Sequence, residues 1–174
     1  MNKRTTKLAL SSLFLSIGLL LPFLTGQIPA IAKIALPMHY PIFLCGLILG
    51  PKPGLLIGII CPLLRSLLFS MPMLYPTAIA MAVELGAYGL IAGLIYNCRK
   101  EKNLFDIYLS IIPAMLAGRI LGGITTALLL GLKGSDYSMS IFLASYFINC
   151  AAGIVAELLL IPPITRFLAS SITK

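Results

Sequence analysis

Charged residues are scarce in this chain: they make up 10% of its 174 residues, and only five of them are acidic. Soluble domains typically carry about 25% charged residues. Here hydrophobic residues make up 59% of the chain instead. This composition excludes an ordinary soluble domain and predicts a single integral membrane domain over residues 1–174.

Motifs of common enzyme and cofactor sites are also missing. The chain has one histidine and no HExxH pattern, and no Ser or Cys stands near a general base. Its four cysteines lack the spacing of metal ligands, so they are expected to be buried apolar side chains. It has no GxxxxGK[ST] loop for ATP. We therefore expect no catalytic residues, no metal and no cofactor.

Six apolar stretches approach the roughly 20 residues that a helix needs to cross a bilayer. They are residues 7–24, 38–49, 53–69, 76–97, 105–132 and 139–168. The second is short, and the sequence Gly50-Pro51-Lys52-Pro53-Gly54 after it predicts a tight hairpin. The predicted fold is an all-α membrane protein, a bundle of six transmembrane helices.

Basic residues divide unevenly between the two predicted ends of this bundle. Nine fall at one end: Lys3, Arg4, Lys7, Lys52, Arg99, Lys100, Lys102, Arg166 and Lys174. Only Lys33 and Lys133 fall at the other. The positive-inside rule then predicts that the N- and C-termini are both cytoplasmic. The same division accounts for the net charge of +8 without any nucleic-acid surface. A cleavable signal peptide is an alternative for the N-terminus, although five membrane segments would still follow it.

Small residues recur every four positions in two places. They are Gly46, Gly50, Gly54 and Gly58, and then Ala114, Gly118 and Gly122. This spacing lets helix backbones approach closely. We favour packing inside the bundle over a partner interface. Ser12 and Ser16 form one such pair on the first helix. For this pair, a face that docks on a partner protein is the alternative to packing inside the bundle.

Polar residues within apolar spans are the candidates for function, because an unpaired charge in hydrocarbon is costly. By predicted depth, seven could line a cavity open to the outside: His39, Arg65, Tyr75, Glu84, Arg119, Tyr146 and Asn149. Arginine can grip a carboxylate through two parallel hydrogen bonds, so a small anion with polar arms is a reasonable guest. The alternative is a structural network in which Arg65 pairs with Glu84 and Arg119 pairs with Glu157. In both cases Glu157 is expected to be a structural partner.

Two proline-containing segments, residues 25–37 and 70–75, would join helices at the outer side. Proline stiffens the backbone and removes a hydrogen-bond donor. These segments could be lids over the cavity, or the prolines could simply end the helices.

The block from Leu36-Pro37-Met38-His39-Tyr40-Pro41 through Pro62-Leu63-Leu64-Arg65-Ser66 and Met71-Pro72-Met73-Leu74-Tyr75-Pro76-Thr77-Ala78 to Glu84 resembles the S components of energy-coupling factor (ECF) vitamin transporters. S components are the substrate-binding subunits. The basic N-terminus, the six spans and the final Leu160-Ile161-Pro162-Pro163-Ile164 extend the likeness. Within the family, the block is most similar to the pantothenate type.

This resemblance implies a subunit of the bacterial cytoplasmic membrane that captures pantothenate from outside. It also implies docking on a transmembrane scaffold (T) component and two cytoplasmic ATPases. The family's first helix commonly carries an Ala-xxx-Ala docking motif, and the matching positions here are Ser12 and Ser16. Another micronutrient, such as cobalamin or riboflavin, is the nearest alternative cargo. A self-contained secondary transporter and a membrane enzyme using His39 and Glu84 are the alternatives from other classes.

Overall fold

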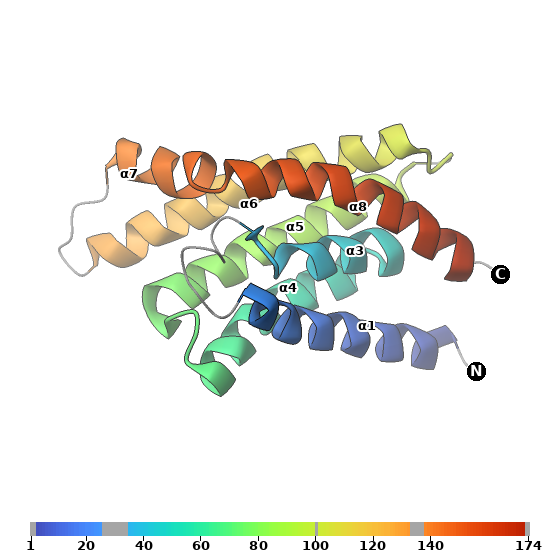
Figure 1. The fold of residues 1–174 in the computed structure, drawn as a ribbon, viewed down its shortest axis with the longest axis horizontal. Helices are drawn as coiled ribbons and strands as arrows, with labels where there is room; N and C mark the ends of the chain where they lie inside the picture. Colours follow the sequence, from blue (N-terminus) through green and yellow to red (C-terminus); the bar gives the residue numbers. More distant parts are fainter. Residues whose placement is uncertain (1–2, 26–34, 100, 133–137, 173–174) are drawn as a thin grey trace.

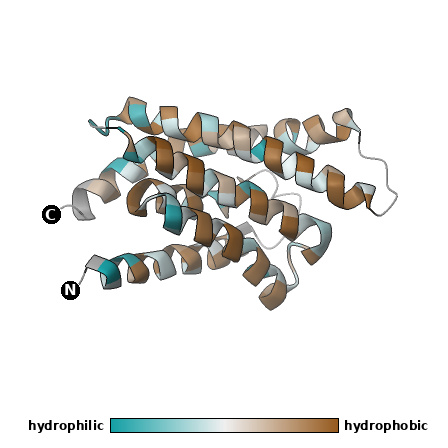
Figure 2. Ribbon diagram, turned by 180° about the vertical axis from the view of Figure 1, so that it is seen from behind, coloured by the Kyte–Doolittle hydropathy of each residue, from teal (hydrophilic) through white to brown (hydrophobic). Residues whose placement is uncertain are grey.

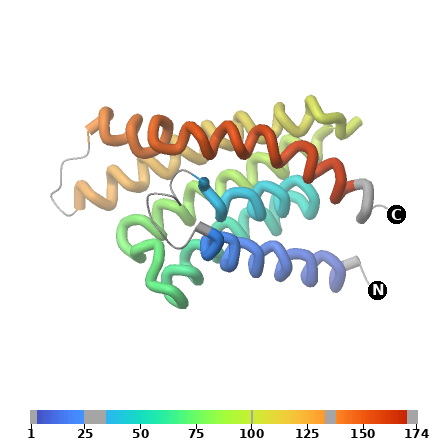
Figure 3. The backbone as a smooth tube through the Cα atoms, in the orientation of Figure 1, coloured from blue at the N-terminus to red at the C-terminus, as the bar shows by residue number. Residues whose placement is uncertain are grey.

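A computed structural model of the protein describes residues 3–25, 35–99, 101–132 and 138–172, and the regular structure within these ranges is all helical. The long elements are α1 (Lys3–Leu20), α3 (His39–Leu49), α4 (Pro51–Phe69), α5 (Ile79–Asn97), α6 (Leu104–Gly131) and α8 (Ala151–Ile172). Shorter elements extend three of them: η1 (Leu21–Thr25), η2 (Leu74–Ala78), and α7 (Met139–Leu143) with η3 (Ala144–Ile148). Successive helices run back and forth (Figure 3), and both termini lie at one end of the bundle (Figure 1).

Five helical segments are long and apolar enough to cross a membrane. They are Arg4–Leu24, Pro51–Phe69, Leu74–Asn97, Leu104–Gly131 and Met139–Ala169. They match five of the six predicted spans. The remaining one, α3, has 11 residues, which gives it a length of about 16 Å at 1.5 Å per residue. Because the hydrocarbon core is about 30 Å thick, α3 alone is too short to cross it.

Hydrophilic residues gather at the end of the bundle that carries both termini (Figure 2). Lys52 lies in the first turn of α4, and Arg99 and Lys102 lie between α5 and α6. The two basic residues predicted to face outward, Lys33 and Lys133, lie outside the described residues. The side of the membrane on which the termini lie stays a prediction.

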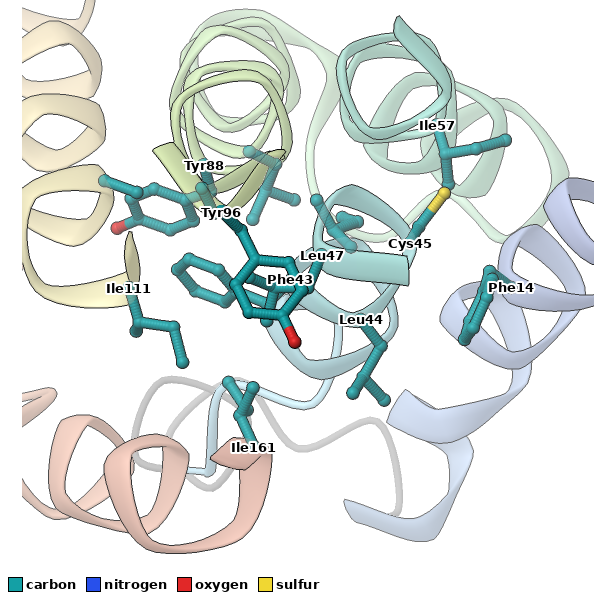
Figure 4. Packing of buried hydrophobic residues seen from close by; sticks show 14 of the residues in the cluster. Phe14, Phe43, Leu44, Cys45, Leu47, Ile57, Tyr88, Tyr96, Ile111 and Ile161 are labelled. Carbon is teal, nitrogen blue, oxygen red and sulfur yellow. The ribbon is translucent and has the colours of Figure 1, made fainter. Parts of the chain in front are cut away.

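α3 lies at the centre of the bundle and occupies only the half of its length nearer the termini (Figure 1). It contacts α1, α4, α5 and α8. Figure 4 shows its side chains packed among residues from the surrounding helices, and Ile42, Phe43 and Cys45 are completely buried. The ring of Phe43 stacks on that of Tyr88 in α5, with 4.9 Å between centroids. Apart from His39 and Tyr40 in its first turn, α3 carries apolar side chains on every side.

The predicted hairpin after α3 is present and is very short. Gly50 alone separates α3 from α4, and its φ of 103° favours glycine. Pro51 then begins α4, where its fixed φ suits the first helical position and no amide hydrogen is needed. The sequence therefore reverses direction within one residue.

Glycines bring α3, α4 and α5 into backbone contact, as the four-residue spacing predicts. A Cβ atom on Gly54 would lie 2.8 Å from Cα of Gly46 and 2.8 Å from the carbonyl carbon of Gly89. A Cβ on Gly58 would lie 2.6 Å from the carbonyl carbon of Leu85. These distances are too short for any side chain, so the glycines serve packing within the bundle.

Candidate functional site

Five polar side chains from four helices meet in the interior, and we call them the buried polar cluster. They are His39 at the start of α3, Glu84 and Tyr88 on α5, Arg119 on α6 and Glu157 on α8. Each exposes at most 5% of its surface. His39, Glu84 and Arg119 are three of the seven predicted site residues. Buried charges are costly unless they are paired, so the pairing within this cluster determines what it can do.

Glu84 and Tyr88 lie one turn apart on α5 and form one half of the cluster. The Tyr88 hydroxyl donates a hydrogen bond of 2.5 Å to Oε1 of Glu84. Two small residues of α6 make room for this pair. A Cβ on Gly122 would lie 3.0 Å from Cβ of Glu84, and a Cβ on Gly118 would overlap the Tyr88 ring. The predicted small-residue spacing of α6 therefore positions the polar groups of α5.

Arg119 uses only part of its guanidinium group. Nη1 donates to the backbone carbonyl of Tyr146 in η3, and the guanidinium interacts electrostatically with both Glu84 and Glu157. Its Nε and Nη2 atoms are buried and have no hydrogen-bond partner among the described residues. The Nε and Nη2 edge presents two parallel N–H groups, the arrangement that binds both oxygens of a carboxylate.

Glu157 and His39 face each other beside Arg119. Nδ1 of His39 lies 3.9 Å from Oε1 of Glu157, too far for a hydrogen bond. Within the part of the chain that the structure describes, neither Glu157 oxygen nor Nδ1 of His39 has a hydrogen-bond partner. Arg119 and Glu157 therefore share no hydrogen bond, so the alternative of a structural pair between them is not what the structure has. The cluster keeps donors and acceptors that do not satisfy one another.

Arg65 lies outside the buried polar cluster. From α4 its Nη1 donates to the carbonyl of Leu19 in the last turn of α1. Its guanidinium lies 5.0 Å from the ring centroid of Phe23 and 5.4 Å from that of Phe69. A cation at the C-terminal end of a helix satisfies free carbonyls and stabilises the helix dipole. Arg65 therefore attaches α1 to α4 and does not form the pair with Glu84 that was the alternative to a ligand site.

The other predicted residues lie at different distances from the cluster. The Tyr75 hydroxyl donates to the carbonyl of Leu129, which is ten residues, or about 15 Å, along α6 from Arg119. Tyr146 borders the cluster through the carbonyl that Arg119 binds, and its hydroxyl lies 2.8 Å from Oγ1 of Thr126. Asn149 is exposed in the turn before α8.

Asn149 directly follows the π-helical turn η3, and neither η3 nor α7 buries a residue. The turn has an i to i+5 hydrogen bond, from the amide of Asn149 to the carbonyl of Ala144, 2.9 Å long. One added residue rotates the following positions by about 100° relative to a continuous α-helix. The prediction that Asn149 lines the cavity holds for a continuous helix, and η3 interrupts the helix here.

Two members of the cluster are not among the seven predicted site residues. Tyr88 stands four residues after Glu84 and so shares its helix face, which is the one signal for it in the sequence. Glu157 is predicted to be a structural partner because of its depth. Glu157 belongs to the cluster because α3 is short. His39, the first residue of α3, lies in the interior of the bundle and faces Glu157 there.

The predicted docking residues lie on an open face of α1. Ser12 and Ser16 are both exposed, and each hydroxyl bonds to a carbonyl four residues earlier in the same helix. Only 17% of the first span is buried, compared with 61% of the span that contains α5. α1 is therefore a peripheral helix with a free surface that carries both serines.

Residues 6–165 match the family model described as the substrate-specific component of the ECF transporter. No curated protein and no solved structure matches the chain significantly.

Proposed function

The chain belongs to the family of substrate-specific components of ECF transporters, and we propose that its substrate is pantothenate, bound at the buried polar cluster. The matched region covers nearly all of the membrane helices. The general role is therefore that of a membrane subunit that binds a substrate for import. The choice of pantothenate goes beyond the family.

The free edge of Arg119 is the observation that carries this proposal. Pantothenate ends in a carboxylate, and Nε and Nη2 of Arg119 offer two parallel donors that have no hydrogen-bond partner among the described residues. An unsatisfied buried donor costs about 1–3 kcal/mol, and a bound carboxylate would remove that cost for two donors. Arg65 already binds the Leu19 carbonyl, so we assign the substrate carboxylate to Arg119.

The rest of pantothenate suits the surroundings of Arg119. Two hydroxyl-bearing carbons flank its dimethyl carbon and an amide follows, so the molecule brings both donors and acceptors on an apolar frame. His39, Glu84 and Tyr146 provide polar groups close to Arg119, while Phe147 lies 5.9 Å from the Arg119 guanidinium. We propose that the subunit binds its cargo without chemical change.

Calorimetric titration of the purified protein in detergent tests the cargo directly. Pantothenate is expected to bind tightly and with one-to-one stoichiometry, while riboflavin and cobalamin, titrated in parallel, are not. Tight binding of either of those two would keep the role and replace the cargo. Import by the purified chain alone in vesicles, without ATPases, would favour a self-contained secondary transporter instead.

We further propose that α1 docks on the T component, which the two cytoplasmic ATPases drive. Ser12→Trp places a large side chain on the exposed face of α1, where close helix contact requires small residues. The variant is expected to lose most co-purification with the T component and the ATPases while it keeps its affinity for pantothenate.

The matched control for this docking prediction is Leu128→Trp. Leu128 is 65% exposed on α6, a helix that packs on α5 and α8. The control is expected to co-purify with the transporter module like the parent protein. Equal recovery of both variants would remove the docking role from this face of α1.

A further inference from the structure

We infer that Glu157 and His39 form a second half of the substrate site, which selects ligands that carry hydrogen-bond donors, such as hydroxyl groups, in addition to an anionic end. This inference rests on the proposed function of the buried polar cluster. It gives Glu157 a direct role in recognition instead of the structural role expected from its depth.

The first step is the unmatched chemistry of Glu157. Its side chain is completely buried, and both carboxylate oxygens are without a hydrogen-bond partner in the described ranges. Glu84 differs, because its Oε1 accepts from the Tyr88 hydroxyl. Of the two carboxylates, Glu157 is therefore the one with both oxygens available to a ligand.

The second step is the position of Glu157 relative to Arg119. Arg119 and Glu157 interact with each other electrostatically. Even so, Nε and Nη2 of Arg119 and both side-chain oxygens of Glu157 have no hydrogen-bond partner among the described residues. A ligand that presents an acceptor to Arg119 and a donor to Glu157 satisfies both sets at once. Nδ1 of His39, 3.9 Å from Oε1 of Glu157, adds one more group that such a ligand can bind.

The third step is selectivity against simpler anions. A ligand with a hydroxyl group forms a hydrogen bond with the buried Glu157 carboxyl group. An anion without hydroxyl groups leaves that carboxyl group buried and without a partner, which is costly. Specificity commonly arises when the wrong ligand leaves a desolvated polar group unpaired. The cluster would thus favour hydroxylated acids over plain fatty or acyl acids.

A pair of ligands and one substitution test this inference. N-(3,3-dimethylbutanoyl)-β-alanine is pantothenate without its two hydroxyl groups, and it keeps the amide and the carboxylate. Glu157→Gln replaces one of the two carboxyl oxygens with an amide NH2 group of the same size. The variant is expected to bind pantothenate about tenfold more weakly than the parent does, the loss expected for one hydrogen bond. Its affinity for the dehydroxylated analogue is expected to stay unchanged or rise.

Each outcome of these titrations has a separate meaning. Retained analogue binding shows that the variant is folded, and Glu101→Gln, an exposed glutamate in the turn before α6, is the matched control. Equal weakening of both ligands, or of neither, would overturn the role of Glu157. If the parent protein itself does not bind pantothenate, the proposed cargo fails, and the inference fails with it. If Glu157→Gln does not fold, His39→Gln is titrated with the same two ligands and the same criterion.

Discussion

Arg119→Gln is expected to weaken pantothenate binding by at least about 100-fold. The substitution removes the two parallel donors that the free edge of Arg119 offers to a carboxylate. Hydrogen bonds to charged groups each contribute about 1.5–3 kcal/mol, and every 1.4 kcal/mol changes affinity about tenfold. The loss also leaves Glu84 and Glu157 without their shared cation. Calorimetric titration of parent and variant measures the effect.

Two controls separate carboxylate binding from damage to the fold. Panthenol, in which a primary alcohol replaces the carboxylate of pantothenate, is expected to bind the parent and Arg119→Gln with similar affinity. Arg65→Gln removes another buried guanidinium, one that binds the Leu19 carbonyl and not the cluster, and it is expected to leave pantothenate affinity nearly unchanged. Equal losses for panthenol and pantothenate would contradict a specific carboxylate contact. A large loss in Arg65→Gln alone would move the carboxylate to Arg65.

Gly89→Ala is expected to lower the free energy of unfolding by about 3 kcal/mol, the upper part of the range for overpacked cores. The added Cβ would lie 2.8 Å from Cα of Gly54. The opposing atoms belong to the backbone of α4, so no side-chain rotation can relieve the overlap and the two helices must separate. Because total stabilities are about 5–15 kcal/mol, the bulkier Gly89→Leu is expected to prevent folding. Thermal unfolding in detergent and size-exclusion profiles measure both effects.

The matched control for this packing prediction is Gly131→Ala. Gly131 ends α6, and a Cβ atom there would have no neighbour within 4 Å. Alanine is the better helix former by about 1 kcal/mol, so this variant is expected to be as stable as the parent or slightly more so. Equal melting temperatures for Gly89→Ala and Gly131→Ala would show that α4 and α5 do not pack as closely as described.

The sequence predicted the helices because long apolar runs leave few alternatives in a membrane. It also predicted the turn at Gly50 and the packing role of Gly46, Gly54 and Gly58, since proline and glycine have distinct backbone properties that apply at each position separately. Charge within an apolar span was the signal that marked the polar residues of the interior as candidates for function. His39, Glu84 and Arg119 do come together, since Arg119 interacts electrostatically with both of the others.

The sequence could not predict which polar residues meet, because that depends on helix phase and depth. Asn149 is exposed just after the π-helical turn η3, and nothing in the local composition marks such a turn. The half-length of α3 places His39 beside Glu157. Arg65 is charged and buried like Arg119, but its partners, Leu19 and two phenylalanine rings, come from segments that sequence spacing does not relate to it.

The hydrogen bond from Arg119 to the Tyr146 carbonyl couples the conformation of η3 to the affinity of the site for a ligand. One guanidinium fixes the backbone of this turn with Nη1 and faces the cluster with Nε and Nη2. The orientation of the Arg119 guanidinium toward a ligand therefore depends on the position of η3, the segment before α8. Such coupling is reciprocal: if a ligand changes the stability of the η3 conformation, a substitution that shifts that conformational equilibrium changes ligand affinity by the corresponding factor, even without touching the ligand.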